Sequence, residues 1–252
     1  MAQQLPRVLI AGGTSGIGLG MARAWRRRGH DVVVVGRDPG RLDGAKEGGI
    51  VVARCDVTSS EELAHVLQAH GPFDIVVFSS AVSSAPEVRV APGMAPIAGA
   101  DVLRELAVNT GGAVLLAQQW LTRRRSGDGG VFVLVGSPAG FAPATSLLYA
   151  TTKGGAHTFA RGLRFQLRGA GVRVVEVMPP AVDTPLNLLP IAKASPDDVG
   201  ERAVAGVMAG RDVVYVGPTW LVSMLVRVWP DLAMRLVDYG SSRRPTSPPR
   251  AS

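Results

Sequence analysis

Short apolar runs rich in β-branched residues alternate with longer amphipathic runs along most of this chain. The apolar runs are continuous, which is typical of strands that are buried on both faces of a parallel sheet. They lie at 7–12, 31–36, 50–57, 74–81, 131–136, 172–179 and 212–217. Parallel strands are joined by right-handed crossovers, which place the intervening helices on both faces of the sheet. The pattern therefore predicts an α/β fold with a doubly wound, seven-stranded parallel sheet in a single domain.

The amphipathic runs between the strands predict the helices of this fold. The expected helices lie at 16–28, 60–70, 101–125, 147–168 and 197–208, with a weaker candidate at 40–46. The stretch "TSSEEL" offers Ser59 or Ser60 as an N-cap, because acidic side chains follow in the first turn. Strands and helices in this order are those of a Rossmann-type domain, which we place at 1–217.

Composition excludes several other classes of protein. A chain of 252 residues with 46% hydrophobic and 19% charged residues is globular rather than disordered. The net charge of +7 raises the possibility of a nucleic-acid partner. The arginines are scattered, however, and no aromatic platform accompanies them, so solvated helix ends or anionic small molecules explain the charge more simply. We expect no nucleic-acid partner.

Cysteine and histidine usage argues against disulfide and metal chemistry. Cys55 is the single cysteine, which excludes an intramolecular disulfide and suits a reducing cytoplasm. It lies in an apolar run and is expected to be a small buried hydrophobe. His30, His65, His70 and His157 lack metal-ligand spacing, so no metal is predicted. An apolar strand begins within a few residues of the first residue, so we expect no signal peptide and a cytoplasmic protein.

The first strand runs directly into the glycine-rich stretch "AGGTSGIG" at residues 11–18. Gly12, Gly16 and Gly18 follow a strand and open a helix, which is the context in which glycines let the backbone approach a pyrophosphate. The spacing is G-x-x-x-G-x-G rather than G-x-G-x-x-G. A structural turn without a ligand is the competing interpretation.

The stretch "YATTK" places Tyr149 and Lys153 four residues apart in a predicted helix. Residues at i and i+4 share one helix face, so the lysine ammonium lies near the phenol. A cation beside a phenol favours the phenolate and lowers a pKa that is ordinarily near about 10. The same spacing also occurs by chance on solvated helices, so spacing alone does not assign a proton-transfer role.

Six motifs occur in a fixed order over about residues 7–217. They are "GGTSGIG", "CDVT", "AVNTGG", "VLVGSPAG", "YATTK" and "PPAVDTP". In this order and context they resemble the motifs of the short-chain dehydrogenases/reductases, and specifically the shorter, reductase-type branch of that family. The resemblance implies a catalytic group of four residues, namely Asn109, Ser137, Tyr149 and Lys153. Tyr149 would be the acid/base, Ser137 would bond the substrate oxygen, Lys153 would also bond the nicotinamide ribose, and Asn109 would hold a water.

The resemblance also implies a dinucleotide site. Its expected residues are Gly12, Thr14, Ser15, Gly16, Ile17, Gly18, Arg37, Asp56, Val57, Ser80, Ala81, Lys153, Pro179, Val182 and Thr184. NAD-specific relatives place an acid at the end of the second strand, whereas a 2′-phosphate requires an arginine. Gly36 occupies the acid position here and Arg37 follows, which favours NADP over NAD. The alternative is that Arg37 only caps the strand end, and Asp38 lies close by.

Three departures from the family pattern affect the expected site. "SSAV" at 79–82 replaces the family's "NNAG", so Val82 stands where a glycine would lie beside the cofactor. Ser137 and Tyr149 are twelve positions apart, one fewer than is usual, so the loop between them must be tighter. Pro179 and Pro180 replace "PG", which stiffens the wall near the nicotinamide and removes a backbone donor.

The predicted function is an NADP-dependent oxidoreductase that interconverts a ketone and a secondary alcohol. The segment 186–198 occupies the place of the substrate lid, and its apolar first half favours an apolar small molecule, unless Leu186, Leu188, Leu189 and Ile191 only pack on the domain. One alternative is a dinucleotide-binding sensor without turnover. Another is a dehydratase or epimerase that uses the same site.

The segment 218–240 extends beyond the matched core as an apolar C-terminal extension. Charges and Pro230 interrupt it, so a membrane span is not expected. It predicts two amphipathic helical pieces meeting at Pro230, with an apolar stripe formed by Trp220, Leu221, Met224, Leu225 and Val228. We expect the active-site rim or a second subunit of a dimer or tetramer to cover this stripe, with peripheral membrane contact as the alternative. The polar tail 241–252 is expected to be disordered.

Overall fold

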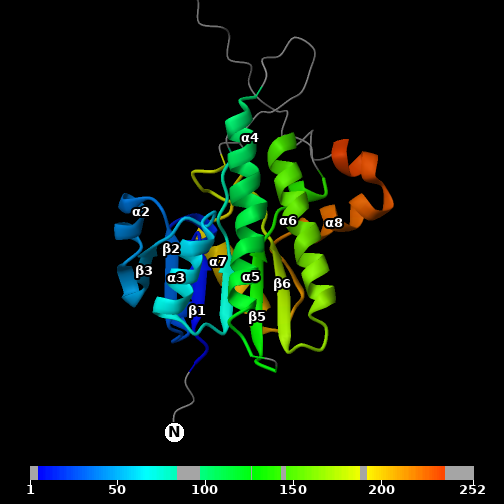
Figure 1. The fold of residues 1–252 in the computed structure, drawn as a ribbon. Helices are drawn as coiled ribbons and strands as arrows, with labels where there is room; N and C mark the ends of the chain where they lie inside the picture. The colour runs from blue at the N-terminus through cyan, green and yellow to red at the C-terminus, as the bar shows by residue number, and fades with distance from the viewer. Residues whose placement is uncertain (1–4, 84–96, 126, 143–145, 188–191, 236–252) are drawn as a thin grey trace, which may run out of the picture.

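The computed structural model describes residues 5–83, 97–125, 127–142, 146–187 and 192–235. They form one sheet of seven parallel strands flanked by helices, as the sequence predicts (Figure 1). The strands are β1 (Val8–Ala11), β2 (Val32–Gly36), β3 (Val51–Arg54), β4 (Ile75–Phe78), β5 (Gly130–Val135), β6 (Val172–Met178) and β7 (Val213–Tyr215). Their order is β3-β2-β1-β4-β5-β6-β7. The order reverses between β1 and β4, and ligands of such sheets bind at this switch point.

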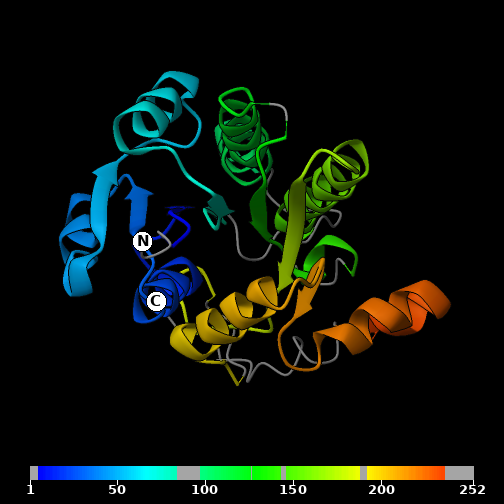
Figure 2. The same cartoon turned by 90° about the horizontal axis from the view of Figure 1, so that it is seen from below.

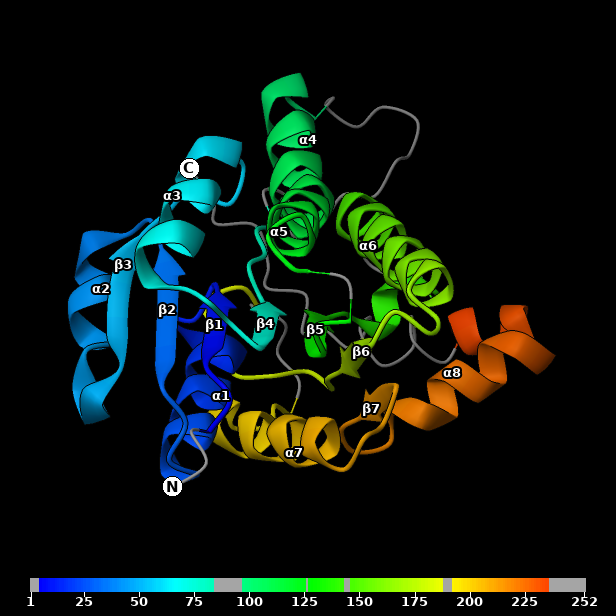
Figure 3. The ribbon, with the colours of Figure 1, turned by 60° about the horizontal axis from the view of Figure 1, so that its bottom comes forward.

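Two layers of helices bury the two faces of the sheet (Figures 2 and 3). The helices are α1 (Gly16–Arg27), α2 (Pro39–Gly44), α3 (Ser60–His70), α4 (Gly99–Leu106), α5 (Gly112–Leu121), α6 (Leu147–Gln166), α7 (Pro196–Met208) and α8 (Thr219–Val228). One apolar core joins α1 and α7 to the sheet, and the other joins α3, α5 and α6 to the opposite face. Ser59 caps α3 by accepting a hydrogen bond from the Glu62 amide, as predicted.

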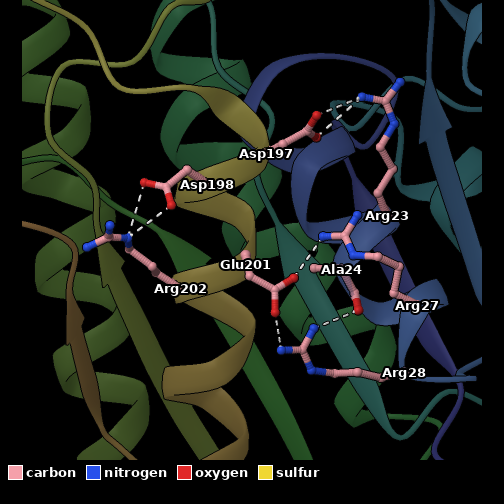
Figure 4. Close-up of polar contacts among 8 residues, drawn as sticks. All are labelled: Arg23, Ala24, Arg27, Arg28, Asp197, Asp198, Glu201 and Arg202. Atoms are coloured by element: carbon pink, nitrogen blue, oxygen red, sulfur yellow. Dashed lines mark hydrogen bonds and ion pairs between the residues drawn. The ribbon is translucent and has the colours of Figure 1, made fainter.

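Helices α1 and α7 pack backbone to backbone through glycines. A Cβ atom on Gly20 would lie 2.2 Å from the Pro196 carbonyl oxygen, and one on Gly200 would lie 2.2 Å from the carbonyl carbon of Gly20. Ion pairs between the two helices surround this contact (Figure 4). Arg23 pairs with Asp197 at 3.3 Å, while Arg27 and Arg28 both pair with Glu201. The arginine run at 23–28 is therefore largely engaged in helix packing.

The predicted helix at 101–125 is divided by a change of pitch. Helix α4 ends at Leu106, a π-helical turn (η2) covers Ala107–Gly111, and α5 ends at Leu121. Asn109 lies in the π-turn, and single π-turns in helices often occur at functional sites.

Helix α8 and the residues after it follow the predicted break at Pro230. Residues 230–235 form a second helical stretch. The active-site rim leaves most of the apolar stripe of α8 uncovered, because Trp220, Leu221, Met224 and Val228 are 49%, 46%, 52% and 74% exposed. Cover by a second subunit, the other half of the expectation, stays a prediction.

Polar groups explain why α8 turns this way. The Thr219 hydroxyl donates to the Met178 carbonyl at 2.9 Å, and the Ser223 and Tyr215 hydroxyls lie 2.9 Å apart. These bonds direct the polar side of α8 inward. No helix among the described residues is long and apolar enough to cross a membrane. The predicted disordered tail at 241–252 lies outside the described residues.

Candidate active site

A cavity of about 1220 Å³ opens at the carboxyl ends of the strands. Its volume exceeds the roughly 300–1,000 Å³ of an ordinary ligand pocket. The residues of the predicted site that line it are Gly12, Thr14, Ser15, Gly16, Ile17, Arg37, Val57, Ser80, Ala81, Ser137, Tyr149, Lys153, Pro179, Val182 and Thr184. Three others, Gly18, Asp56 and Asn109, lie behind or beside its lining. The fold thus gathers residues from six different strand ends into one site.

The glycine turn between β1 and α1 brings backbone to the cavity surface. Gly12 and Gly16 have positive φ angles of 78° and 54°, which glycine adopts without strain. A Cβ on Gly12 would lie 2.5 Å from the Ser80 nitrogen. Gly18 serves packing instead, because its Cβ would lie 2.2 Å from the Gly12 carbonyl oxygen. Ser15 makes no side-chain cap, so the first-turn amides of α1 suit the phosphates of a dinucleotide.

Two arginines, Arg37 directly after β2 and Arg41 in α2, line the cavity, and position 36 at the end of β2 carries no acid. A Cβ on Gly36 would lie 2.8 Å from the Thr14 hydroxyl oxygen, so a side chain there would require Thr14 to shift. Arg37 lines the cavity and pairs with Asp56 at 3.0 Å. Asp38 instead caps α2 by accepting from the Gly40 and Arg41 amides at 3.0 and 3.4 Å. Arg41 also lines the cavity, and sequence reasoning missed it.

Asp56 is held beside the cavity by its own neighbours. Burial raises the pKa of its carboxyl, but hydrogen bonds from the Thr58 amide and hydroxyl and the pair with Arg37 bring the pKa below its ordinary value. Cys55, the preceding residue, is buried as predicted, and burial raises the pKa of its thiol to about 12. A protonated thiol is a poor nucleophile.

Asn109 joins the end of β4 to α6. Its Oδ1 accepts from the Val82 amide at 2.8 Å, and its Nδ2 donates to the Val82 carbonyl at 2.8 Å and to the Thr152 hydroxyl at 3.0 Å. The side chain is fully buried. Asn109 therefore fixes the "SSAV" segment against the helix that carries Tyr149 and Lys153, and Val82 both lines the cavity and packs against the core.

Lys153 is buried at the base of the cavity. Its Nζ donates to the Val135 carbonyl at 3.1 Å and lies 5.7 Å from the centroid of the Tyr149 ring. Burial lowers the pKa of Lys153 to about 8, against the opposing effect of the carboxylates of Glu176 and Glu105. The ammonium is therefore poised to lose its proton only slightly above neutral pH.

Tyr149 faces the cavity one helical turn before Lys153. Burial raises the pKa of its phenol to about 12, although a hydrogen bond with Ser137 lowers it, and Glu105 adds to the increase. This differs from the sequence expectation of a pKa lowered by Lys153, because burial outweighs the hydrogen bond from Ser137. The same hydrogen bond shows that Ser137 reaches Tyr149 despite the shortened spacing. A 3₁₀ turn at Pro138–Gly140 (η3) directly follows Ser137.

Apolar residues form one part of the remaining wall of the cavity, and Ser83, Arg104, Ser146, Asn187 and Thr219 form another. Pro179, Pro180 and Leu186 come from the segment after β6, and Val222 comes from α8. Leu188, Leu189 and Ile191 of the predicted lid lie outside the described residues.

Sequence reasoning gave no role near this site to three titratable residues, two buried glutamates and one partly buried histidine. Glu105, Glu176 and His157 come from α4, β6 and α6. A signal existed for one of them, since Glu176 interrupts the apolar strand "VRVVEVM". No group of three or more His, Cys, Asp or Glu side chains in the described part of the chain is arranged to hold a metal ion.

Comparison with known proteins agrees with this geometry. The family model for short chain dehydrogenases matches residues 6–189. The chain is similar to the uncharacterized oxidoreductase DltE of Bacillus subtilis, at 30% identity over 187 residues, which cover 71% of this chain and 73% of that protein. Two solved structures are also similar to it. One is a short-chain dehydrogenase from Sphingobium yanoikuyae in complex with NADPH, at 27% identity and a TM-score of 0.74, covering 98% of this chain and 100% of that chain.

The other is the bulky-bulky ketone specific alcohol dehydrogenase from Comamonas testosteroni, at 26% identity and a TM-score of 0.73, covering 97% of each chain. The matched region includes the glycine turn, Ser137, Tyr149 and Lys153, all of which line one cavity. This chain belongs to the short-chain dehydrogenase family.

Proposed function

We propose that this protein is an NADP-dependent oxidoreductase that interconverts a ketone and a secondary alcohol on an apolar small molecule. The observation that carries the proposal is the meeting of Ser137, Tyr149 and Lys153 in the cavity that the glycine turn also lines. When bound, the nicotinamide cofactor would supply or accept the hydride. The residues of the chain bind and orient the cofactor and the substrate, and they exchange the proton with the substrate oxygen.

Two arginines support NADP as the cofactor. Arg37 and Arg41 both line the cavity beyond β2, and Gly36 occupies the position of the acid that would bond a ribose hydroxyl. The similar protein from Sphingobium yanoikuyae was solved with NADPH. We assign the 2′-phosphate to the guanidinium of Arg37, with Arg41 as a second cation.

Tyr149 is the proton donor and acceptor in this proposal. With a pKa of about 12 its phenol is protonated at neutral pH, which suits a general acid that donates to a carbonyl oxygen during reduction. Ser137 bonds the phenol and faces the same space, so both hydroxyls are available to one substrate oxygen. The buried ammonium of Lys153 stabilises negative charge that develops there.

The wall of the cavity supports an apolar substrate. Pro179, Pro180, Leu186 and Val222 present carbon atoms to it. A ketone substrate is further supported by the likeness to the bulky-bulky ketone specific enzyme from Comamonas testosteroni. A cytoplasmic location and a homo-oligomeric state are also part of the proposal. The single buried cysteine suits a reducing compartment, and exposed apolar side chains on α4 and α8 suit subunit contacts.

The decisive experiment is a panel of aliphatic and aromatic ketones assayed with the full-length protein by loss of NADPH absorbance, with NADH in parallel. We expect turnover with apolar ketones and a preference for NADPH. Binding of NADPH without turnover of any ketone or alcohol would replace the enzyme with a dinucleotide-binding protein. Loss of water or inversion of a centre without net oxidation would instead indicate a dehydratase or epimerase.

A further inference from the structure

Helix α6 carries a third titratable residue on the face of Tyr149 and Lys153. The residues Tyr149, Lys153 and His157 follow one another at intervals of four, so they lie along one side of the helix. The Nδ1 atom of His157 lies 2.9 Å from both carboxylate oxygens of Glu176. The Glu176 side chain is 1% exposed and that of His157 is 23% exposed.

The position of Glu176 places this pair directly behind the active site. Glu176 lies on β6 opposite Leu134 of β5, and the next residue of β5, Val135, accepts the hydrogen bond from Lys153. A Cβ on Gly136 would lie 2.8 Å from the Glu176 Oε1. Gly136 lines the cavity immediately before Ser137. The carboxylate therefore occupies space beneath the cavity floor that position 136 leaves open.

A buried carboxylate in an apolar strand is costly unless charged or hydrogen-bonding groups compensate it. His157 provides a direct hydrogen bond, and the buried ammonium of Lys153 adds a longer-range electrostatic attraction. We propose that Glu176 and His157 are a positioning pair, in which His157 holds the Glu176 carboxylate beneath the cavity floor and the carboxylate keeps Lys153 protonated. This inference rests on the proposed function, in which Lys153 serves both Tyr149 and the cofactor.

The charges around Lys153 determine in which direction its pKa changes when Glu176 is neutralised. Tyr149 approaches it from the same helix, Glu176 from β6 and Glu105 from α4, and both carboxylates raise the pKa of the ammonium while burial lowers it to about 8. His157 faces Glu176 and the ring of Phe141, whose centroid lies 5.8 Å away. Removing the charge of Glu176 therefore lowers the pH at which Lys153 loses its proton. His157 keeps the carboxylate turned in one direction.

The test compares the pH dependence of NADPH binding in the wild type, Glu176→Gln and Glu176→Asp, using full-length protein and cofactor fluorescence. Gln keeps the size and the hydrogen bond to His157 but removes the charge. We expect the loss of NADPH affinity at high pH to begin roughly 1 to 3 pH units lower in the Gln variant. The Asp variant keeps the charge at a greater distance and should lie between the other two.

Which of the two variants impairs NADPH binding more distinguishes an effect of charge from an effect of structure. A purely structural role for Glu176 makes Asp the more damaging change, because the shorter Asp side chain loses the contact with His157, and that order would overturn the proposal. An unshifted pH dependence in a folded Gln variant would overturn it as well. In a Lys153→Met background, Glu176→Gln should no longer change the pH dependence of NADPH binding. If it persists there, Glu176 does not act through Lys153.

Turnover distinguishes this inference from the proposed function. The pH profiles of kcat and KM for ketone reduction should shift in the same direction as NADPH binding in the Gln variant. Should no ketone or alcohol react while the binding shift occurs, the redox function fails and the positioning pair stands. Should ketones react while the Gln variant follows the wild type at every pH, the pair fails and the function stands.

Discussion

The hydroxyl of Tyr149 is the group on which the proposed chemistry depends. Tyr149→Phe removes only that hydroxyl, so we expect turnover to fall to background while NADPH affinity stays within about twofold, given that a conservative change away from a contact costs little. Stopped assays with NADPH and the best ketone, together with a fluorescence titration, measure both. Lys153→Ala should impair both, and wild-type turnover in the Phe variant would refute the role of Tyr149.

The raised pKa of Tyr149 predicts opposite pH dependences for the two directions. A phenol with a pKa of about 12 remains protonated through neutral pH, so the proton donor for reduction is available there. Oxidation of the alcohol requires the phenolate, whose fraction grows about tenfold per pH unit below the pKa. The rate of oxidation at saturating alcohol and NADP should therefore increase from neutral pH up to the pH at which Lys153, whose pKa is about 8, loses its charge. A bell-shaped profile centred near pH 7 would contradict this assignment.

Arg37 is the residue that we expect to select the cofactor. Arg37→Ala should weaken NADPH binding by about 1 to 3 kcal/mol, the range for losing a charge-assisted contact, and leave NADH little changed. Lys46→Ala is the matched control, because this cation pairs with Asp43 and does not line the cavity. Isothermal titration with both cofactors measures the difference. An equal loss for NADPH and NADH would mean that Arg37 acts by fixing Asp56.

At the scale of elements, the contact between α1 and α7 supports the glycine turn. Gly20→Ala would bring a Cβ atom to 2.2 Å from the Pro196 carbonyl oxygen, so the two helices must separate. Such overpacking typically costs about 1 to 3 kcal/mol. We expect a loss of this size in urea unfolding, together with weaker NADPH binding because α1 begins at Gly16.

Gly162 provides the control for this prediction. It lies in α6 with nothing within 4 Å of an added Cβ. Gly162→Ala should therefore stabilise the protein by about 0.4 to 1 kcal/mol. A Gly20→Ala variant that was as stable as Gly162→Ala would show that the helices can separate without cost.

At the scale of the whole molecule, the exposed stripe of α8 is the surface that most requires a partner. Truncating α8 would also remove Thr219 and Val222 from the cavity, so substitution is the cleaner test. We expect the wild type to be an oligomer and Trp220→Ser/Met224→Ser to shift it toward a smaller mass while retaining turnover. Light scattering after size exclusion measures this. Unchanged mass, with flotation on anionic vesicles by the wild type alone, would assign the stripe to a membrane surface.

Much of the fold follows from the sequence alone. The seven strands, their order of appearance and most helix ends can be predicted because continuous apolar runs and amphipathic periodicity are local properties of the chain. The glycine turn, Ser137, Tyr149 and Lys153 can also be predicted from the sequence alone. Each is recognised by residue type and short spacing, and the parallel sheet then brings the strand ends together.

Only the tertiary structure decided the environment of those residues. The pKa of Tyr149 rises rather than falls because burial depends on chain segments that are distant in the sequence. Asn109 bonds Val82 and Thr152, and Glu176 meets His157, across separations that no local pattern encodes. The outward direction of the α8 stripe is likewise fixed by Thr219 and Ser223 bonding to the core. Short-range patterns specify the elements and their motifs, whereas charge, solvation and orientation are set by what packs against each element.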